Sequence, residues 1–391
     1  SRGRGDVYKR QTKDDQAATQ LHDIGVYLVK NQTEEVGFRI LAGGGLGRTP
    51  VIGQEVFEFV EKKHLLTALE AILRVYNRHG RRDNKYKARI KILVKETGIV
   101  EFRDQVHTEW ERIKDGPQTL SEEEIERCKS FFVDPSYLDI EDNPNELVKA
   151  LDANILFNSW HKQNVSPHKN SGYAIVTICL KETGIAPGDV TDTQLDYIAD
   201  LADEFSFSEV RVTHHQNLVF PNVEQSKLYR FWQKLKDQSL ASMNLGLLTD
   251  MICCPGGDFC ALANAKSIPI AESIQREFKN IEELEELGEL RINISGCMNA
   301  CGHHHVGNIG ILGVDKKGEE FYQVSLGGSS RNEASLGKII GPSFAQEEIP
   351  VVLRKIVAVY RDNKEADESF LETYKRVGIN PFKEKVYAKA D

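Results

Sequence analysis

Four cysteines in two closely spaced pairs constrain this chain more than any other feature. Five residues separate Cys254 from Cys260, and three separate Cys297 from Cys301. Glycine and proline crowd both segments, which read CPGGDFC and GCMNACG, so we predict tight turns where backbone approaches a bulky inorganic group. Four thiolates are the ligand set of a cubane [4Fe–4S] cluster.

Zinc is the main alternative for these cysteines. Structural zinc sites usually separate paired cysteines by two to four residues, and the gap between Cys254 and Cys260 fits that spacing poorly. Seven cysteines, four of them clustered, are typical of a reducing compartment rather than of a disulfide scaffold. We therefore favour a cluster over zinc, place disulfides below both, and expect a cytoplasmic protein.

Length and charge exclude some classes of function. A chain of 391 residues predicts two or three domains. A net charge of −9 argues against a dedicated nucleic-acid binder, and no apolar stretch approaches the length of a membrane span. Within the first residues, Ser1–Gln11, the portion Asp6–Gln11 resembles the translation of a sequencing-library adapter, so we exclude Ser1–Gln11 from the predicted fold.

The chain contains an internal duplication. Asp23-Ile24-Gly25 recurs as Asn308-Ile309-Gly310, and each copy continues through a strand-like run, a glycine-rich turn and an amphipathic helix. Further landmarks recur in the same order: Tyr76 and Tyr360, Gly98 and Gly378, Phe102 and Phe382, Val106 and Val386. All four clustered cysteines precede Asn308, and the first copy has only a short lead before Asp23, so cluster ligation rests on the second copy.

A segment of different character lies between the copies. Ser159–Pro167 is predicted to be a linker, Tyr173–Leu180 a strand, and Asp192–Glu204 a helix capped by Thr191. Val210–Phe220 is predicted to be one strand with a polar centre, and Ser226–Lys236 a second helix. This order suggests a ferredoxin-like α+β unit. The predicted domains are residues 12–158, 159–240 and 241–391, all of the α+β class.

From Asp15 to about Val386 the sequence resembles the siroheme-dependent nitrite and sulfite reductase family. Its branch of bacterial assimilatory sulfite/nitrite reductase hemoproteins is the most similar. The words that carry the resemblance are GGGLGRTP (43–50), RVTHHQN (211–217), CPGGDFC (254–260) and CMNAC (297–301). The family's fold has two duplicated cluster- and siroheme-type domains separated by a ferredoxin-like half-domain.

The resemblance implies both cofactors and reaction. In that family the four cysteines hold a [4Fe–4S] cluster and the last one, here Cys301, also bridges to the siroheme iron. The reaction is a six-electron reduction of sulfite to sulfide or of nitrite to ammonia. Electrons come from ferredoxin or from an NADPH-linked flavoprotein subunit. A non-catalytic iron–sulfur or zinc protein remains the alternative function.

Siroheme carries many carboxylates, so cations and amides are candidate contacts. We predict Arg48, Arg331, Asn299, Gln216 and Asn217 in that role, with surface or turn-stabilising roles as their alternatives. The family's substrate-binding arginines and lysine pair map upstream of this sequence. We therefore expect an N-terminally truncated chain that lacks this cationic pocket and name no catalytic residue.

Two further groups of residues are less specific. One or two of His303, His304 and His305 are predicted to pack beside the prosthetic group rather than to bind a metal. A basic run could dock an acidic electron donor, although a solvated helix face is the simpler interpretation. It comprises Arg81, Arg82, Lys85, Lys87, Arg89, Lys91 and Lys95.

Overall fold

The computed structural model describes residues 15–388 of the chain. The described residues form two compact units, one of residues 15–135 with 330–336 and a larger one of residues 136–329 with 337–388. The segment Ser1–Gln11, which the sequence suggests is an artefact, lies outside the described residues. Among the residues described, no helix is long and apolar enough to cross a membrane.

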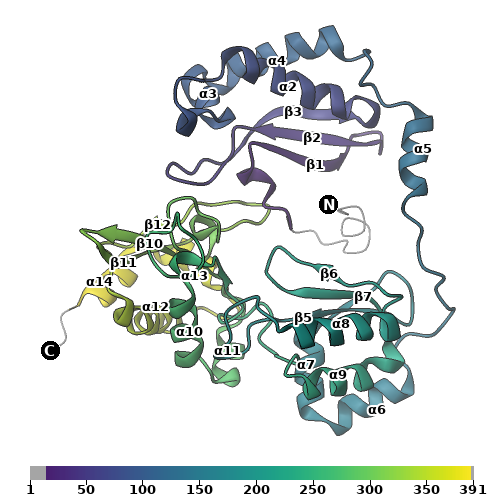
Figure 1. Ribbon diagram of the computed structural model, residues 1–391, viewed down its shortest axis with the longest axis vertical. Coiled ribbons are helices and arrows are strands. Elements are labelled where there is room, and N and C mark those ends of the chain that lie inside the picture. The colour runs from purple at the N-terminus through teal and green to yellow at the C-terminus, as the bar shows by residue number, and fades with distance from the viewer. Residues whose placement is uncertain (1–14, 389–391) are drawn as a thin grey trace. The chain divides into compact units, whose positions relative to one another are not determined.

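The smaller unit is a three-stranded sheet covered by helices on one face (Figure 1). Its antiparallel strands follow chain order: β1 (Ile24–Lys30), β2 (Val36–Ala42) and β3 (Gln54–Glu61). Its helices are α2 (Leu65–His79), α3 (Ile90–Thr97), α4 (Ile99–Ile113) and α5 (Glu122–Ser130). Helices α2 to α4 bury apolar side chains such as Ile72, Leu93 and Phe102 in one core with the strands.

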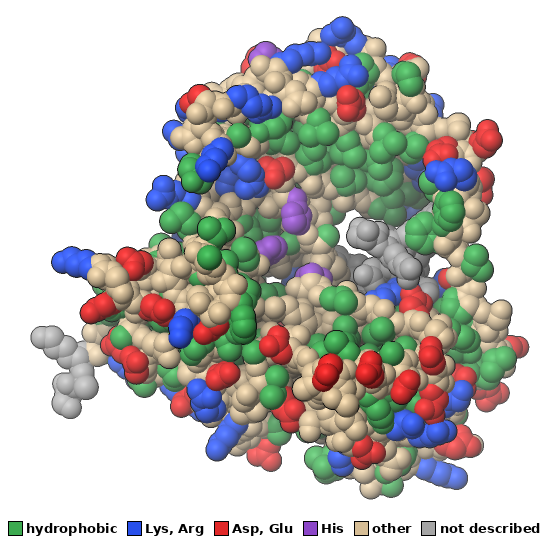
Figure 2. Space-filling view, in the orientation of Figure 1, with side chains coloured by type: hydrophobic (Ala, Val, Ile, Leu, Met, Phe, Trp, Pro, Cys, Tyr) green, Lys and Arg blue, Asp and Glu red, His purple; other side chains and the backbone are tan. Residues whose placement is uncertain are grey.

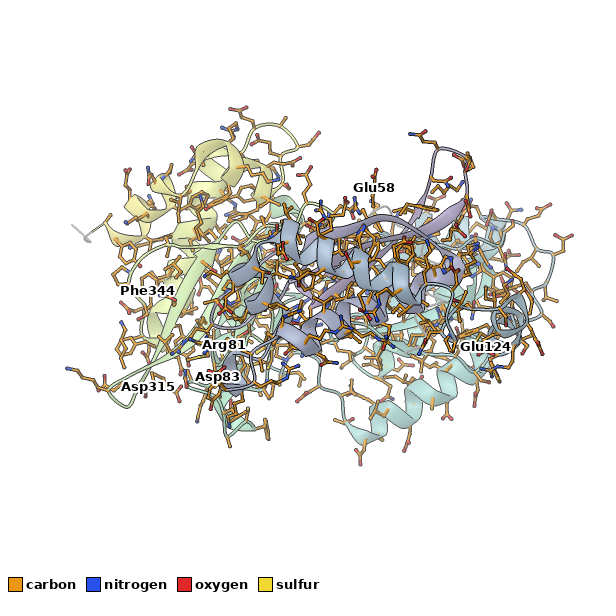
Figure 3. The ribbon with its side chains drawn as sticks, turned by 90° about the horizontal axis from the view of Figure 1, so that it is seen from above. Glu58, Arg81, Asp83, Glu124, Asp315 and Phe344 are labelled. Carbon is orange, nitrogen blue, oxygen red and sulfur yellow. The ribbon has the colours of Figure 1, made fainter. Side chains whose placement is uncertain are left out.

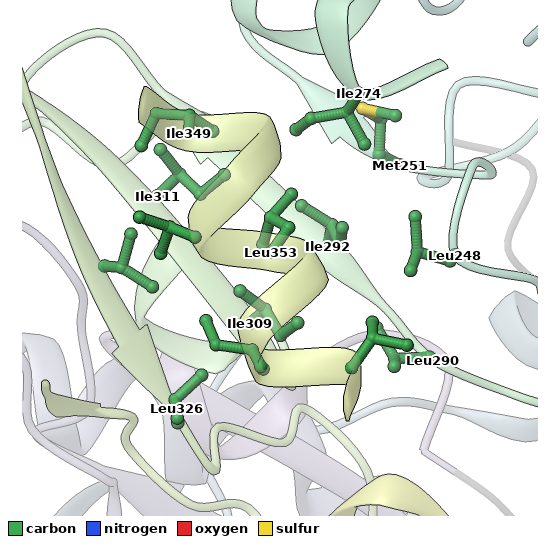
Figure 4. Packing of buried hydrophobic residues seen from close by; sticks show 14 of the residues in the cluster. Leu248, Met251, Ile274, Leu290, Ile292, Ile309, Ile311, Leu326, Ile349 and Leu353 are labelled. Carbon is green, nitrogen blue, oxygen red and sulfur yellow. The ribbon is translucent and has the colours of Figure 1, made fainter. Parts of the chain in front are cut away.

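The second copy, in the larger unit, has a five-stranded sheet. The strand order is β12 (Lys338–Ile339), β11 (Glu319–Leu326), β10 (Ile309–Lys316), β9 (Ile292–Ser295) and β8 (Ile252–Cys253). Strands β8, β9 and β10 are parallel to one another, whereas β11 and β12 pair antiparallel. The helices are α10 (Ile268–Glu277), α11 (Ile281–Leu287), α12 (Ile349–Asn363), α13 (Phe370–Val377) and α14 (Asn380–Tyr387). Ile309 and Ile311 of β10 share this core with Leu353 of α12 (Figure 4).

The predicted duplication is confirmed. Strands β1 and β10 each begin at the repeated Ile-Gly pair, and α2 and α12 are both 15 residues long. Gly98 and Gly378 have positive φ angles of 81° and 74° at the same junction between two helices, α3–α4 and α13–α14. Phe102 and Phe382 are both fully buried. Beyond this shared pattern, only the second copy shows strands equivalent to β8 and β9 within residues 15–388.

The half-domain between the copies is a four-stranded antiparallel sheet with helices on one face (Figure 1). The strand order is β4 (Val165–Pro167), β5 (Tyr173–Ile178), β7 (Leu218–Glu224) and β6 (Arg211–Val212). Its helices are α6 (Asn145–Ala153), α7 (Ile155–Asn164), α8 (Asp192–Phe205) and α9 (Leu228–Asp237). As predicted, Thr191 caps α8, where its side chain accepts a hydrogen bond from the Gln194 N–H.

Two predictions about this region were wrong. Ser159–Pro167 is not a linker, because it forms the end of α7 and strand β4, and Trp160 is fully buried in the half-domain core. The predicted boundary at residues 158 and 159 therefore falls inside α7. Val210–Phe220 is not one interrupted strand but the hairpin of β6 and β7, because Gln216 takes a left-handed φ of 57° and the chain reverses there.

Candidate metal centre

The parallel pair of β8 and β9 brings the two cysteine segments together. Cys253 pairs with Ile294 in register, so the chain leaves both strands at the same edge of the sheet. Cys254 follows β8 directly, and Gly296 and Cys297 follow β9. The Gly296 N–H donates a hydrogen bond to the Cys254 Sγ at 3.0 Å. The two cysteine segments, which lie far apart in the sequence, are thus brought together by the pairing of the strands that precede them.

The first cysteine segment folds back onto the second. After Cys254 a short turn at Gly256–Asp258 reverses the chain, and the Cys260 N–H donates to the Gly256 carbonyl at 2.9 Å. The N–H groups of Asn264 and Ala265 then donate to the Gly296 carbonyl at 2.8 and 3.1 Å. Residues 254–265 therefore form a loop whose two ends are hydrogen-bonded to Gly296, and Cys260 is one of the residues of this loop.

The second cysteine segment is tied to β9 by buried polar side chains. Ser295 Oγ accepts from the Gly302 N–H at 3.1 Å, and Asn293 Nδ2 donates to the Gly302 carbonyl at 2.8 Å. A Cβ on Gly302 would lie 1.9 Å from the Ile294 carbonyl oxygen, so only glycine fits there. These contacts hold the turn that follows Cys301 against the strand that precedes Cys297.

The four thiols are close enough to influence one another. The pKa of the Cys301 thiol is raised, first by partial desolvation of its sulfur and then by the nearby Cys254, Cys297 and Cys260, although the residue as a whole is exposed. Cys297 is buried, Cys254 and Cys260 are half-buried, and Cys301 is exposed. Cys301 is therefore the member of the set most open to a further group.

A cubane cluster and a single zinc ion place different geometric demands on four thiolates. Zinc draws its four sulfurs around one point at about 2.3 Å each, whereas a cubane bonds each thiolate to a different iron. Within residues 15–388, no group of three or more His, Cys, Asp and Glu side chains is arranged to hold one metal ion. A [4Fe–4S] cluster would be held by Cys254, Cys260, Cys297 and Cys301, and would supply electron storage.

Gln216 and Asn217 use their amides inside the protein. Gln216 Nε2 donates to the Cys253 carbonyl at 2.8 Å, and its Oε1 accepts from the Cys253 N–H at 2.9 Å. Asn217 Oδ1 accepts from the Leu180 N–H at 3.0 Å. Its Nδ2 donates to Asp250 at 3.0 Å. Contact of these two residues with siroheme stays a prediction, and the structure gives both amides partners of their own.

A buried lysine organises the turn that carries both amides. The Lys181 side chain is fully buried, and its Nζ donates to the carbonyls of His215 and Gln216 at 2.6 and 2.9 Å. It also donates to Asn217 Oδ1 at 2.6 Å and forms an ion pair with Asp250 at 3.1 Å. Lys181 and Asp250 were not predicted from the sequence, because a buried ion pair between distant residues leaves no local pattern.

The remaining predicted contacts are placed as follows. Asn299 is exposed in the turn between Cys297 and Cys301. Arg48 is exposed and Arg331 half-buried, both in the smaller unit. His304 is buried, and neither ring nitrogen has a hydrogen-bond partner among the described residues. Burial lowers the pKa of His304 to about 3, so this ring is neutral at physiological pH.

Comparison with protein families identifies the chain. A model described as "Nitrite and sulphite reductase 4Fe-4S domain" matches twice, over residues 10–114 and 247–391. A second model, "Nitrite/Sulfite reductase ferredoxin-like half domain", matches residues 167–238. The chain belongs to the nitrite and sulfite reductase family. The predicted α+β fold of two such domains flanking a half-domain is confirmed, and a [4Fe–4S] cluster and siroheme are the cofactors of this family of oxidoreductases.

Relatives within the family act on either anion according to their names. The chain is 26% identical over 364 residues to a chloroplastic ferredoxin–nitrite reductase of Arabidopsis thaliana, covering 88% of this chain and 54% of the relative. It is also 26% identical over 334 residues to sulfite reductase [ferredoxin] 2 of Mycolicibacterium paratuberculosis, covering 82% and 52%. The chain thus spans about half the length of the curated relatives it matches.

A solved structure of the family shares the fold. The NirA protein of Mycobacterium tuberculosis superimposes with a TM-score of 0.69 at 22% identity. The match covers 94% of this chain and 62% of that one. At this identity the likeness concerns the fold alone.

Proposed function

We propose that this chain belongs to a siroheme- and [4Fe–4S]-dependent reductase of a small oxyanion, with sulfite as the first substrate and nitrite as the second. The observation that carries the proposal is the placement of Cys254 and Cys297 at the same end of two parallel strands, with Cys260 and Cys301 on the turns that follow. Nitrite stays a candidate because relatives named for each anion match equally well.

We propose Cys301 as the thiolate shared between cluster and siroheme. It is exposed, whereas the other three thiols are buried or half-buried, so it is the thiol most accessible to a large macrocycle. Bound there, siroheme supplies the iron at which an oxyanion is reduced by six electrons with uptake of protons. A thiolate shared by both groups would give electrons a short covalent route from the cluster.

The cofactors are tested by loading the chain anaerobically with iron, sulfide and siroheme. We expect four irons per chain beyond the siroheme iron, together with intense siroheme absorption bands. Protein that binds zinc and gives no such bands would contradict the proposal. The substrate is tested by assaying the full-length gene product with reduced viologen and each anion in turn. The anion with the higher kcat/KM is the substrate.

The electron donor is proposed to be ferredoxin, as in the names of the relatives, and to dock on exposed members of the basic run. Arg82, Lys85, Lys87 and Lys95 are exposed. The run does not lie on a single helix face, the simpler alternative to docking, because it crosses a loop and a short turn before α3. Arg81 pairs with Asp83 at 2.6 Å (Figure 3). Arg89 pairs with Asp23 at 2.8 Å.

Lys91 is the member of the run that cannot meet a partner. It is buried, which lowers its pKa, and its Nζ donates to the carbonyls of Leu46 and Thr49 at 2.7 and 2.8 Å. It therefore holds the glycine-rich loop of residues 43–50. By contrast, α8 exposes a row of carboxylates that would repel an acidic donor (Figure 2). These are Asp192, Asp196, Asp200, Asp203 and Glu204.

Charge-reversal variants distinguish the docking of ferredoxin from the reduction of the substrate. We expect Lys85→Glu with Lys87→Glu to raise the KM for ferredoxin several-fold, an effect that shrinks at high salt, and to leave viologen-driven turnover unchanged. Lys149→Glu, on exposed α6, is the matched control. An unchanged KM in the double variant would exclude this surface as the docking site.

A further inference from the structure

The side chain of Gln216 closes the open edge of strand β8. Strand β8 lies at the end of its sheet, so one edge pairs with β9 and the other has no neighbouring strand within residues 15–388. The Gln216 amide fills that place by pairing with both the N–H and the carbonyl of Cys253, at 2.9 and 2.8 Å. A primary amide presents one acceptor and one donor side by side, as a neighbouring strand does.

The pairing fixes the peptide group that leads into the first cysteine of the site. The Cys253 carbonyl and the Cys254 N–H belong to one peptide plane. Gln216 holds the carbonyl of this plane, and the Ile294 carbonyl accepts from the N–H at 3.1 Å. With both edges of the plane held, the peptide group from which the Cys254 Cα extends is fixed in place.

The Gln216 amide can hold the Cys253 peptide groups because the backbone of Gln216 is itself held rigidly. Gln216 lies at φ 57°, a left-handed conformation that costs a residue with a side chain free energy. Lys181 offsets that cost by donating to the carbonyls of His215 and Gln216, and Asp250 in turn neutralises Lys181. All of these groups are buried or half-buried, so the turn has few alternative arrangements.

We propose that Gln216 is a positioning residue for the metal centre, through which the half-domain orients Cys254 toward the cluster. The inference rests on the proposed function, because it requires Cys254 to be a cluster ligand. It departs from the expectation that Gln216 contacts siroheme, since both ends of its amide are engaged by Cys253. The half-domain is thereby part of the cluster site, although it supplies no cysteine to it.

The test compares two changes at Gln216 with a matched change at Gln275. Gln275 is a fully buried glutamine whose amide makes the same kind of pair, accepting from the Gly184 N–H at 3.2 Å and donating to the Ile185 carbonyl at 3.3 Å. Gln275→Ala therefore removes an equivalent pair from a loop without a cluster cysteine. Gln216→Asn keeps a residue that tolerates the left-handed conformation but shortens the reach by one methylene.

The full chain is loaded with the cluster, and the rate of iron loss to a chelator is measured. We expect Gln216→Ala and Gln216→Asn to lose iron about tenfold faster than the unchanged chain, because loss of a group supporting a ligand typically weakens metal binding by that factor or more. Both variants should also shift the electron paramagnetic resonance spectrum of the reduced cluster. Gln275→Ala should stay within about twofold and keep the spectrum.

Three outcomes would contradict the inference or its basis. Unchanged iron loss in both Gln216 variants would overturn it. Equal acceleration in Gln275→Ala, with the same loss of thermal stability, would overturn it by showing general destabilisation only. An unchanged chain that binds no cluster would instead sink the proposed function, and this inference with it, before any variant is compared.

Discussion

The backbone N–H of Gly296 donates a hydrogen bond to the Sγ of Cys254 across 3.0 Å, although 42 residues separate the two positions. N–H groups aimed at a ligating sulfur stabilise its negative charge and tune the potential of an iron–sulfur cluster. The contact is set by the parallel pairing of β8 and β9, so the sheet itself would supply part of the environment of the proposed cluster.

Gly296→Ala should disturb this environment directly. A Cβ at Gly296 would lie 2.6 Å from the Ala265 carbonyl and 2.8 Å from the Gly256 Cα, so the loop must move. We expect a loss of stability of about 1–3 kcal/mol together with a fall in bound iron. Gly318→Ala is the control, because its Cβ would meet nothing within 4 Å and only its φ of 87° is unfavourable. Denaturant unfolding and iron analysis check both.

Serine substitutions of the two exposed cysteines, Cys301 and Cys128, should have different effects on bound iron and siroheme. Cys301→Ser removes the thiolate proposed to join the cofactors, so iron content should fall and the siroheme bands should shift. Cys128→Ser, on α5 in the smaller unit, should change neither. Absorption spectra and iron analysis of loaded protein make the comparison. Unaltered spectra in Cys301→Ser would remove Cys301 from the site.

The lowered pKa of Glu368 predicts that the free energy of unfolding depends on pH. Its pKa is lowered to about 2, chiefly by the hydrogen bond from Arg376, so the folded chain favours the ionised form. The resulting stabilisation is fully present above the unfolded pKa of about 4.3 and is lost as the pH falls through that value toward about 2. Urea unfolding of Glu368→Gln should therefore differ from that of the unchanged chain at pH 7, and the difference should shrink below about pH 4.

A matched carboxylate provides the comparison for Glu368. Glu384 is exposed on α14, so Glu384→Gln should leave the unfolding curve nearly unchanged at both pH values. A difference in Glu368→Gln that stays constant with pH would show that the carboxylate acts through packing rather than through its charge.

Lys181→Met should be among the most damaging single changes in the larger unit. It leaves Asp250 buried without its cation and removes the donor from two carbonyls. Breaking a buried ion pair on one side typically costs about 3–5 kcal/mol. Lys227→Met, which removes an exposed pair with Glu224, should cost less than about 1 kcal/mol. Equal effects in denaturant unfolding would show that burial of Lys181 contributes little.

The sequence alone predicted the cysteine quartet as a metal site, and it identified the duplication and helices α8 and α9 of the half-domain. These rest on local signals: thiols at short spacing, apolar residues in helical register such as Phe231 and Leu235, and the Thr191 cap. Local signals also explain the errors. The turn at Gln216 lacks glycine, so the hairpin of β6 and β7 looked like a single strand. Trp160 looked like part of a linker because its partners lie far along the chain.

The sequence was therefore enough to predict which residues could hold a metal, because thiolate chemistry depends on residue type and spacing. How those residues are oriented was decided only by the tertiary structure. The pairing of β8 with β9, the amide of Gln216 on Cys253 and the buried cation of Lys181 all join residues at least 30 positions apart. Such contacts form only when the chain is folded, because no local preference brings these groups together. Burial in the folded chain also makes each of these hydrogen bonds stronger than it would be in water.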